Sequence, residues 1–358
     1  MTDAKEITLI IPTYNRQNYV LRNLNYWSDK NIVVHVFDGS INPIDSNELS
    51  GLGSNIFYHH FPTSLVERLE FSINFISTKY VAMLADDEFF LYSGLLECTK
   101  QLDLDPFYVA CAGRSMRIFI QDDEILSEPA YPNAANYDGN SRNVTDRIKQ
   151  HMHPYKMAAL YSVVRADVWA KAIRSFSKTN YTLASYEELA FELATAYQGG
   201  IKVLPILYWL RSSEEPPVRH TSCVIEEVHS LRWASHRLWD VERKEFFHNI
   251  ARSLMSNNNE ALYIEQIIKT GFAEYLKSAK KSLRKHNLNF CLQSIKKLIK
   301  KLILTPLGFK YKKRHRLPSL FDVVKSMERS GVRVNYEELF EIIKIVNKFH
   351  NINIKTEE

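Results

Sequence analysis

Strand-like and helix-like runs alternate at short spacing through the N-terminal half of this chain. Ile7 to Ile11 reads as a strand, Arg16 to Trp27 as a helix and Asn31 to Phe37 as a second strand. A helix-like run from Leu65 to Ile76 then leads into the strand-like run Tyr80 to Leu84. Alternation of this kind is typical of βαβ units, so it predicts an α/β fold with a mainly parallel sheet flanked by helices.

Two further strands are expected at Phe107 to Ala112 and Ile201 to Leu210. Between them, the polar segment from Gln121 to Asn143 contains prolines, asparagines and a glycine, which predicts a long surface loop. Loops of that length in compact domains often bind ligands. The residues that follow the strands are therefore the first place to look for function.

A second domain is expected after the last strand. Pro216 and Pro217 interrupt regular structure, and beyond them leucine, isoleucine and lysine recur at helical spacing. The 358 residues, 45% of them hydrophobic, are enough for two cores. We expect an α/β domain over 1–222 and an α-helical domain over 223–358.

The cysteines and the N-terminus indicate the cellular setting. No CxxC pair and no zinc-like spacing occurs among the four cysteines, so they are expected to be reduced and mostly buried; they are Cys98, Cys111, Cys223 and Cys291. The N-terminus lacks the shape of a signal peptide, and no run of about 18 apolar residues occurs. These features predict a cytoplasmic protein.

Three consecutive acids, Asp86, Asp87 and Glu88, directly follow the apolar strand that ends at Leu84 and Ala85. Adjacent carboxylates repel one another, and a divalent cation is one way to neutralise them. Mg²⁺ and Mn²⁺ prefer such oxygen ligands and are commonly shared with substrate phosphates. The alternative is a solvated acidic turn, which this pattern alone favours.

Polar residues follow three of the expected strands. They are Pro12 to Arg16 after the first, Asp38 to Ser40 after the second, and the acids Asp86 to Glu88 after the fourth. Ligands of parallel sheets bind at the carboxyl ends of the strands. The agreement between the three segments favours a ligand site at this edge.

Taken together, these three segments resemble a family 2 glycosyltransferase of the GT-A fold. The resemblance covers roughly residues 5 to 215 and rests on the order and spacing of the motifs. It implies an inverting transferase with a nucleotide-sugar donor, expected to be UDP-linked, and an acceptor that is a saccharide or a lipid-linked precursor of surface polysaccharide. It also implies Mn²⁺ or Mg²⁺ as the cofactor.

The resemblance assigns the nucleotide contacts to the first two segments. Pro12, Thr13, Asn15 and Arg16 after the first strand, and Asp38 after the second, would contact base and ribose. An aspartate can accept a hydrogen bond from a uracil imide, which gives a reason for Asp38. Read by itself, the Asp38 segment is better explained as a turn.

The acids would correspond to the DxD motif of the family, with glutamate in its last position. Asp86 and Glu88 are then the expected metal ligands, and Asp87 is expected to face the donor sugar. His220 is a candidate third ligand, or else a surface histidine beside prolines. The expected metal would offset charge on the departing phosphate.

Two arginines are candidate diphosphate contacts. Arg211 follows the last strand, and its planar fork suits phosphate oxygens. Arg68, on the helix-like run before the acids, could reach the phosphates or simply be a solvated helix residue.

Glu188 is the candidate general base, with Glu187 in reserve. Both belong to the segment Ser185 to Leu189, where the family usually shows Glu-Asp, and the base would take the proton of the acceptor hydroxyl. Ser185 and Glu188 also have the spacing of a capping box, which would give Glu188 a structural task instead.

The segment 277–316 contains 14 Lys and Arg and no acid, while the rest of the chain carries 32 basic and 41 acidic residues. Within it, lysines and apolar residues alternate at helical spacing, as in helices that lie on anionic membranes. We expect peripheral attachment to the inner face of the membrane, against the alternative of a helix packed on the protein. No nucleic-acid module accompanies the segment, so nucleic acid is not expected as a partner.

The chain is thus expected to be a glycosyltransferase. One alternative is a nucleotidyltransferase of similar fold, although the segment Pro12 to Arg16 lacks the glycine-rich phosphate loop of that class. The other is a domain without catalysis that serves as a membrane-associated scaffold. Release of pyrophosphate from a nucleoside triphosphate would favour the first alternative, and absence of nucleotide binding would favour the second.

Overall fold

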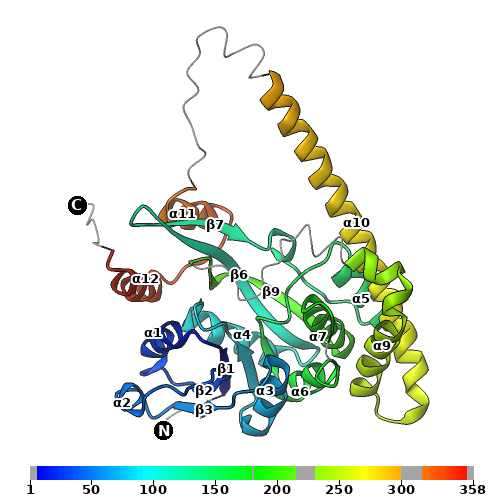
Figure 1. Ribbon diagram of the computed structural model, residues 1–358, viewed down its shortest axis with the longest axis horizontal. Helices are drawn as coiled ribbons and strands as arrows, with labels where there is room; N and C mark the ends of the chain where they lie inside the picture. The colour runs from blue at the N-terminus through cyan, green and yellow to red at the C-terminus, as the bar shows by residue number, and fades with distance from the viewer. Residues whose placement is uncertain (1–5, 180, 215–229, 300–316, 353–358) are drawn as a thin grey trace.

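The computed structural model describes residues 6–179, 181–214, 230–299 and 317–352, without side-chain detail for 258 and 286–299. Its strands are β1 (Ile7–Thr13), β2 (Val33–Asp38), β3 (Ile56–His60), β4 (Tyr80–Met83), β5 (Phe89–Phe90), β6 (Tyr108–Gln121), β7 (Glu124–Ala130), β8 (Val163–Arg165) and β9 (Gly200–Ser212). They form one sheet in the order β3-β2-β1-β4-β8-β6-β9-β5, with β7 paired to β6 (Figure 1).

Helices alternate with the first strands and then dominate the C-terminal part of the chain. They are α1 (Gln17–Trp27), α2 (Ser46–Leu49), α3 (Leu65–Ser72), α4 (Tyr92–Leu104), α5 (Val144–Met152), α6 (Ala166–Arg174), α7 (Ser185–Gln198), α9 (Asp240–Leu254), α10 (Ala261–Ile299), α11 (Leu320–Arg329) and α12 (Tyr336–His350). The expected fold class, an α/β sheet flanked by helices and followed by further helices, is confirmed.

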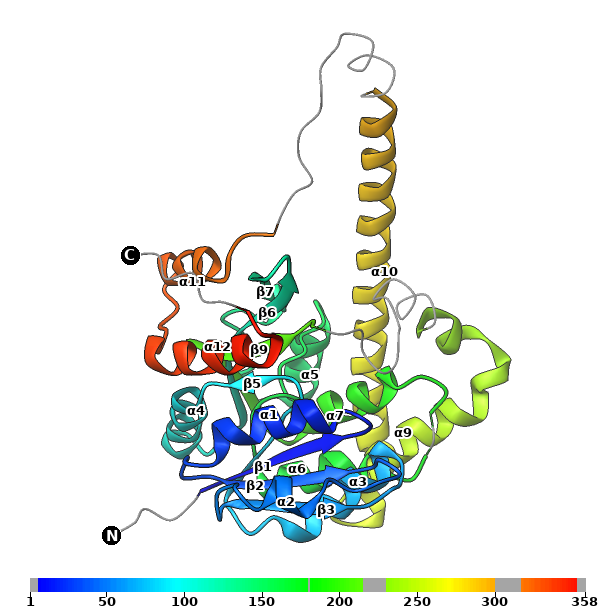
Figure 2. The same cartoon turned by 60° about the vertical axis from the view of Figure 1, so that its left-hand side comes forward.

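The parallel part of the sheet comprises β3, β2, β1 and β4. β1 lies at its centre, and Leu9, Ile10 and Ile11 are fully buried, as expected for a parallel strand covered on both faces. Figure 2 shows α1 and α12 on one face of these strands and α3 and α6 on the other. This arrangement brings the carboxyl ends of β1, β2 and β4 to one edge.

The remaining strands make the sheet mixed. β8 is antiparallel to both β4 and β6, whereas β6 and β9 run parallel. The expected surface loop from Gln121 to Asn143 is wrong in its first part, because β6 and β7 form a hairpin there. Asp122 and Asp123 make the turn with φ of 53° and 58°, and two positive φ values in a two-residue turn match the twist of a hairpin.

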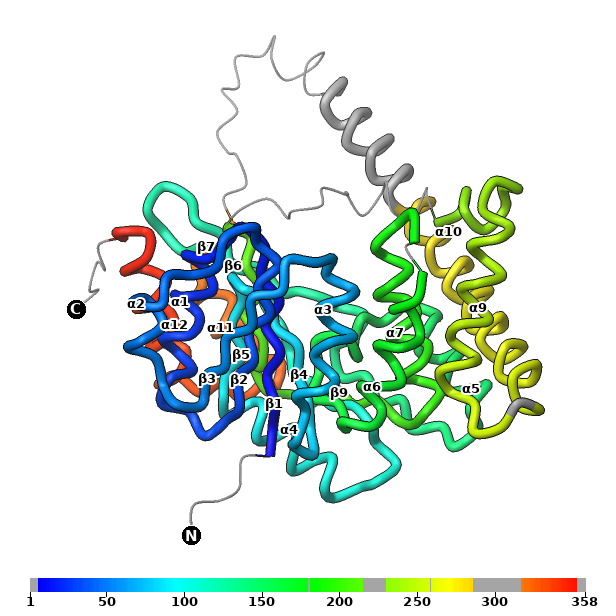
Figure 3. Tube along the Cα trace, turned by 60° about the horizontal axis from the view of Figure 1, so that its bottom comes forward, coloured from blue at the N-terminus to red at the C-terminus, as the bar shows by residue number. Residues whose placement is uncertain are grey.

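The C-terminal helices pack on two different parts of the α/β region. α9 and α10 lie with α5 and α7 on the side of the molecule opposite α1 and α12 (Figure 3). α11 instead contacts β7, and α12 contacts α1. The expected boundary between residues 222 and 223 lies outside the described residues.

Within the described residues, none of the helices has the length and apolar character needed to cross a membrane. Cys98 and Cys111 are buried free thiols, as the sequence predicted. The structure does not describe the side chains of Cys223 and Cys291.

Candidate functional site

The polar segments after β1, β2 and β4 meet at one edge of the sheet. Thr13 and Asp38 are register partners at the ends of β1 and β2. The Thr13 hydroxyl donates to Asp86 Oδ2 at 2.7 Å, which joins the end of β1 to the residues after β4. The structure therefore brings together the three segments that the sequence singled out.

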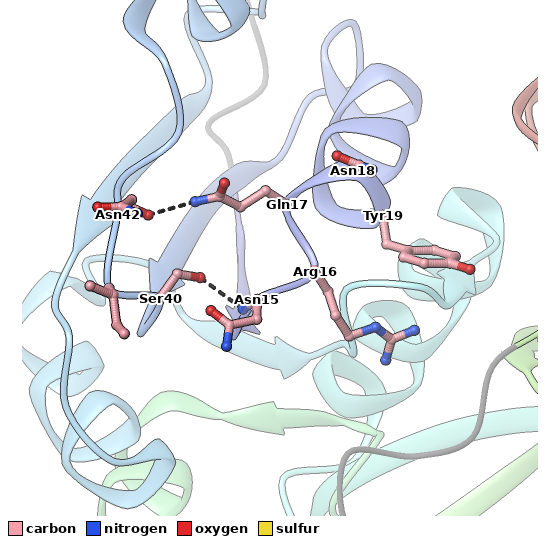
Figure 4. A pocket seen from close by; sticks show the side chains of 8 residues that line it. Asn15, Arg16, Gln17, Asn18, Tyr19, Ser40 and Asn42 are labelled. Carbon is pink, nitrogen blue, oxygen red and sulfur yellow. Dashed lines mark hydrogen bonds between the residues drawn. The ribbon is translucent and has the colours of Figure 1, made fainter.

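A pocket of about 520 Å³ opens between the segments after β1 and β2 (Figure 4). Its lining is mostly polar and comprises Asn15, Arg16, Gln17, Asn18, Tyr19, Ser40, Ile41 and Asn42. Asn15 adopts a left-handed conformation with φ of 55°, and its backbone N–H donates to Ser40 Oγ at 2.8 Å. A volume of this size is that of ordinary small-molecule sites.

Asp38 lies beneath this pocket and is completely buried. Its carboxylate accepts from the Ser40 amide at 2.8 Å, from Gln17 Nε2 at 2.9 Å and from the Tyr58 hydroxyl at 2.7 Å. Burial raises the pKa of Asp38, but these hydrogen bonds outweigh burial, so the pKa lies below its ordinary value. Gln17 also donates to the Asn42 carbonyl, so Asp38 helps to fix the pocket wall.

Arg68 is buried beneath the same edge, so the alternative of a solvated helix residue is wrong. Its Nη1 donates to the carbonyls of Thr13 at 2.5 Å and Phe37 at 2.8 Å. Burial lowers the pKa of Arg68, although the charges of Asp38 and Asp86 act in the opposite direction. Its guanidinium fills the space over Gly39, where a Cβ atom would come within 2.6 Å of Arg68 Cζ.

Asp86 and Asp87 converge on one cation, the guanidinium of Arg16. Nη2 of Arg16 lies 2.5 Å from Asp87 Oδ2, and Nη1 lies 3.4 Å from Asp86 Oδ1. Both acids are buried, whereas Arg16 reaches into the pocket lining. Figure 4 shows the Arg16 side chain at the side of the pocket away from Ser40 and Asn42.

Glu88 faces a different set of partners from Asp86 and Asp87. Trp209 Nε1 donates to Glu88 Oε2 at 2.8 Å, and Arg211 Nε lies 3.6 Å from Oε1. The Tyr131 hydroxyl accepts from Arg211, and its ring stacks on Trp209 with an interplanar angle of 9°. Tyr161 also stacks on Trp209, with ring centroids 4.4 Å apart.

Burial dominates the ionisation of the acids. It raises the pKa of Asp86 to about 7, with Arg16 lowering it and the charge of Asp87 raising it further. Burial likewise raises the pKa of Glu88 to about 8, with Asp87 adding to the increase and Arg211 opposing it. Burial thus disfavours the ionised form of both acids, and the neighbouring arginines offset this only in part.

Glu188 lies in the first turn of α7, half-buried. Burial lowers the pKa of Arg211, but Tyr131, Glu88, Tyr161 and Glu188 outweigh it and raise the pKa above its ordinary value. The charge of Glu188 therefore acts on the group that also contacts Glu88. The half-buried Glu187 lies on the same turn.

The alternative of a capping box is not supported. Ala184 is the N-cap of α7, no side chain caps the helix, and Ser185 Oγ has no hydrogen-bond partner in the described part of the chain. By contrast, α3 begins with a complete box between Ser64 and Glu67. Capping therefore does not account for Glu188.

The three acids have the oxygen chemistry that Mg²⁺ and Mn²⁺ prefer. Their geometry fits a metal only in part, because Asp86 and Glu88, the expected pair of ligands, contact different partners. Among the described residues, no three His, Cys, Asp or Glu side chains are grouped so that they could hold a metal ion. His220, the candidate third ligand, lies outside the described residues.

Sequence reasoning missed several groups at this edge. Trp209 donates to Glu88 and Tyr131 stacks on Trp209, while Arg22 donates from Nη2 to the Asp87 carbonyl at 2.8 Å. Gln17 and Tyr58 hold Asp38. Most of them come from segments far from their partners in sequence, and only Gln17, next to the Pro12 to Arg16 segment, had a signal that could have found it.

No protein-family model matches the chain, and no curated protein sequence matches it. Among solved structures, S. aureus TarS residues 1–349 is similar with a TM-score of 0.41 and 10% identity, covering 79% of this chain and 92% of that chain. Its complexes with UDP-GlcNAc and UDP have TM-scores of 0.40 and 0.38 and identities of 11% and 12%, each covering 78% of this chain and 92% of that chain. Identity this low leaves no residue-level correspondence to transfer.

Proposed function

We propose that this protein is a metal-dependent, inverting glycosyltransferase. It moves a sugar from a nucleotide-diphosphate donor to a hydroxyl of a saccharide or lipid-linked acceptor in surface polysaccharide synthesis. The observation that carries the proposal is the meeting of three polar strand ends, at Thr13, Asp38 and Asp86, beside a polar pocket of about 520 Å³. Inversion follows from the family that the motifs resemble.

The donor nucleotide binds in this pocket, between the segments after β1 and β2. Asn15 and Arg16 line it, and Asp38 holds Gln17 in its wall. The diphosphate then lies near Arg16, whose guanidinium borders both the pocket and the acids. Planar guanidinium groups suit phosphate oxygens, which supports an anionic group at this position.

A divalent cation completes the proposal at the acids. Asp86 is the ligand nearest to the pocket, because it contacts Thr13 and Arg16, and Glu88 is the second expected ligand. When bound, Mg²⁺ or Mn²⁺ would offset negative charge on the departing diphosphate. Burial disfavours the ionised forms of Asp86 and Glu88, and a nearby cation would favour them, which supports a cation at this position.

Glu188 acts as the base in this proposal and removes the proton of the acceptor hydroxyl. Two observations support it: Glu188 does not cap α7, and its charge acts on Arg211, which contacts Glu88. The acceptor would then lie between Glu188 and the donor sugar. In this proposal, Arg211 and Tyr131, which are hydrogen-bonded to each other, would border that space.

The test is transfer by Glu188→Gln, with Glu187→Gln as the matched control on the same turn. Replacing a positioned base lowers turnover by about 100-fold or more, so E188Q is expected to lose transfer while it still binds UDP with Mn²⁺. E187Q is expected to keep both. Donor hydrolysis and calorimetric UDP binding are measured for each variant; full turnover by E188Q would refute the assignment.

We also propose that the basic segment 277–316 holds the protein at an anionic membrane, on the inner face, where a lipid-linked acceptor would be available. The charge of this segment supports it: 14 Lys and Arg and no acid. Binding to vesicles with and without anionic lipid, at low and high salt, tests it, because electrostatic attachment weakens with ionic strength. Equal binding to neutral and anionic vesicles would contradict it.

A further inference from the structure

We infer that the C-terminal helix α12 is a positioning element for the acids at the end of β4, acting through a chain of side-chain contacts from the partly exposed His350 through the buried Glu214 to the buried Arg22. The three acids, Asp86 to Glu88, are called the acid motif below. The effect on nucleotide affinity rests on the proposed function, whereas the effect on the backbone of the motif does not.

Two neighbouring residues of α1 hold the backbone of the acid motif. Arg22 Nη2 donates to the Asp87 carbonyl at 2.8 Å, and Asn23 Nδ2 donates to the Glu88 carbonyl. Asn23 is itself fixed by Trp27, whose Nε1 donates to Asn23 Oδ1 at 2.8 Å. α1 therefore holds the backbone from which the Asp87 and Glu88 carboxylates extend.

Arg22 keeps its position through a partner from the far end of the sheet. Its Nη1 lies 2.6 Å from Glu214 Oε2, and the two side chains are only 2% and 0% exposed. Glu214 follows β9 directly and also accepts from the Ser212 hydroxyl at 3.1 Å. A buried charge that loses its partner is strongly unfavourable, so Arg22 and Glu214 depend on each other.

α12 completes this chain of contacts from the outer side. His350, its last residue, pairs with the same Oε2 atom of Glu214 that contacts Arg22. The neighbouring ring of Phe349 lies 4.7 Å from the Arg22 guanidinium and 4.9 Å from the ring of Tyr19. α12 therefore covers Arg22 with an aromatic ring and anchors its counter-ion.

The other end of α12 fixes the segment that follows the acid motif. Glu338 accepts from the Ser93 amide at 3.0 Å and from its hydroxyl at 2.8 Å, in the first turn of α4. Figures 1 and 2 both show α12 beside α1. α12 therefore contacts both α1, which holds the backbone of the motif, and α4, which follows β5.

This arrangement gives α12 a task at the site even though it supplies no residue to the pocket. A binding site must hold its groups to within about 0.5 Å, and buried supporting residues provide that precision. When α12 loosens, Glu214 and Arg22 lose their cover, and the carbonyls of Asp87 and Glu88 lose fixed donors.

The test uses full-length His350→Ala and Phe349→Ala, with Glu341→Gln as the matched control. Glu341 lies on the same helix and pairs with Lys30 at 3.0 Å, but its side chain is 38% exposed. Amide hydrogen exchange of the peptide around the acid motif, UDP affinity with Mn²⁺ and the thermal midpoint are measured for each. Arg22→Lys is added because lysine keeps the charge but lacks the fork that spans Glu214 and Asp87.

Exchange at the acid motif is expected to rise about tenfold in H350A, F349A and R22K, with UDP affinity three- to tenfold weaker and E341Q unchanged, since local opening governs exchange. An acid motif that exchanges as slowly in H350A and F349A as in the wild type would overturn the inference. So would a uniform rise over the whole sheet, because that reports lost global stability. If the wild type binds no UDP, the proposed function fails, and the exchange data still decide this inference.

Discussion

Asp38 and Asp86 occupy equivalent places on either side of β1, yet their environments shift the pKa of the two carboxyl groups in opposite directions. Both follow or end a parallel strand, and both are buried. Three protein donors hold the Asp38 carboxylate and keep its pKa below the ordinary value. Around Asp86, burial and the charge of Asp87 outweigh Arg16 and Thr13, and the pKa rises to about 7.

The difference separates a part of the site whose carboxylate is satisfied by protein donors from a part whose carboxylates are satisfied only in part. At the β2 end, the protein itself satisfies the carboxylate, so Asp38 stabilises the native fold and shapes the pocket wall. At the β4 end, burial and the charge of Asp87 disfavour the ionised form of Asp86 more than its protein partners favour it, and a bound cation would offset this. A ligand therefore has more to gain at Asp86 than at Asp38.

Asp86→Asn provides the largest test of this contrast. The amide removes one of two adjacent charges, so the free energy of unfolding is expected to stay equal or to rise. Transfer is expected to fall by about 100-fold or more, because the charge that holds the cation is lost. Urea unfolding and donor turnover measure the two effects. A large loss of stability would show that the protein satisfies the Asp86 carboxylate as fully as it satisfies that of Asp38.

Asp38→Asn is expected to behave in the opposite way. The side-chain NH2 group of asparagine would face Gln17, Tyr58 or the Ser40 amide, which are also donors. The free energy of unfolding is therefore expected to fall by about 2 kcal/mol. Affinity for UDP falls only as the pocket wall loosens. Chemical denaturation of both aspartate variants side by side provides the comparison, and an unchanged D38N midpoint would remove the distinction.

The sequence predicted this edge because the signals are local. Apolar runs that end in Thr13, Asp38 and Asp86 define parallel strands, and parallel strands bring their carboxyl ends together. The hairpin of β6 and β7 was missed because its polar turn residues, Asp122 and Asp123, read as part of a loop. Composition does not reveal that both adopt positive φ.

The partners of the acids could not be predicted for a different reason. Arg22 and Glu214 are separated by 192 residues, and Trp209 and Glu88 by 121. No periodicity links such positions, and only the folded sheet brings them into contact. The spacing of Ser185 and Glu188 likewise fits a capping box, but helix α7 begins with Ala184 as its uncapped N-cap.

Arg68→Lys tests the residue whose charge acts on both Asp38, at the end of β2, and Asp86, after β4. Arg68 contacts the carbonyls of Thr13 and Phe37, and its charge acts on both Asp38 and Asp86. Lysine keeps the charge but lacks the guanidinium plane over Gly39, so a loss of about 1 to 2 kcal/mol in the free energy of unfolding is expected. Arg174→Lys, at the end of α6, is the control. An unchanged free energy of unfolding in R68K would mean that Arg68 acts at the ends of β2 and β4 through its charge alone.

Acid pH tests the β2 end without altering its aspartate. His35 on β2 and His59 on β3 lie with Nδ1 and Nε2 2.8 Å apart. Burial, and then the neighbouring His59, lowers the pKa of His35 to about 4, and burial lowers that of His59. The unfolded chain takes up a proton near pH 6.5, so between these values the unfolded state binds more protons than the native state.

The contribution of the pair to the free energy of unfolding is therefore fully present above about pH 6.5. About 1 kcal/mol of it is lost as the pH falls towards 4. Urea unfolding at about pH 7.5 and about pH 5 measures it, with His59→Phe as the comparison, because phenylalanine preserves stacking on Phe37 and Phe75 but cannot be protonated. The carboxylates titrate equally in both proteins, so their effect cancels in the difference. A pH dependence that is the same in H59F would show that His59 contributes nothing to it and would leave the burial of His35 as its source at the β2 end.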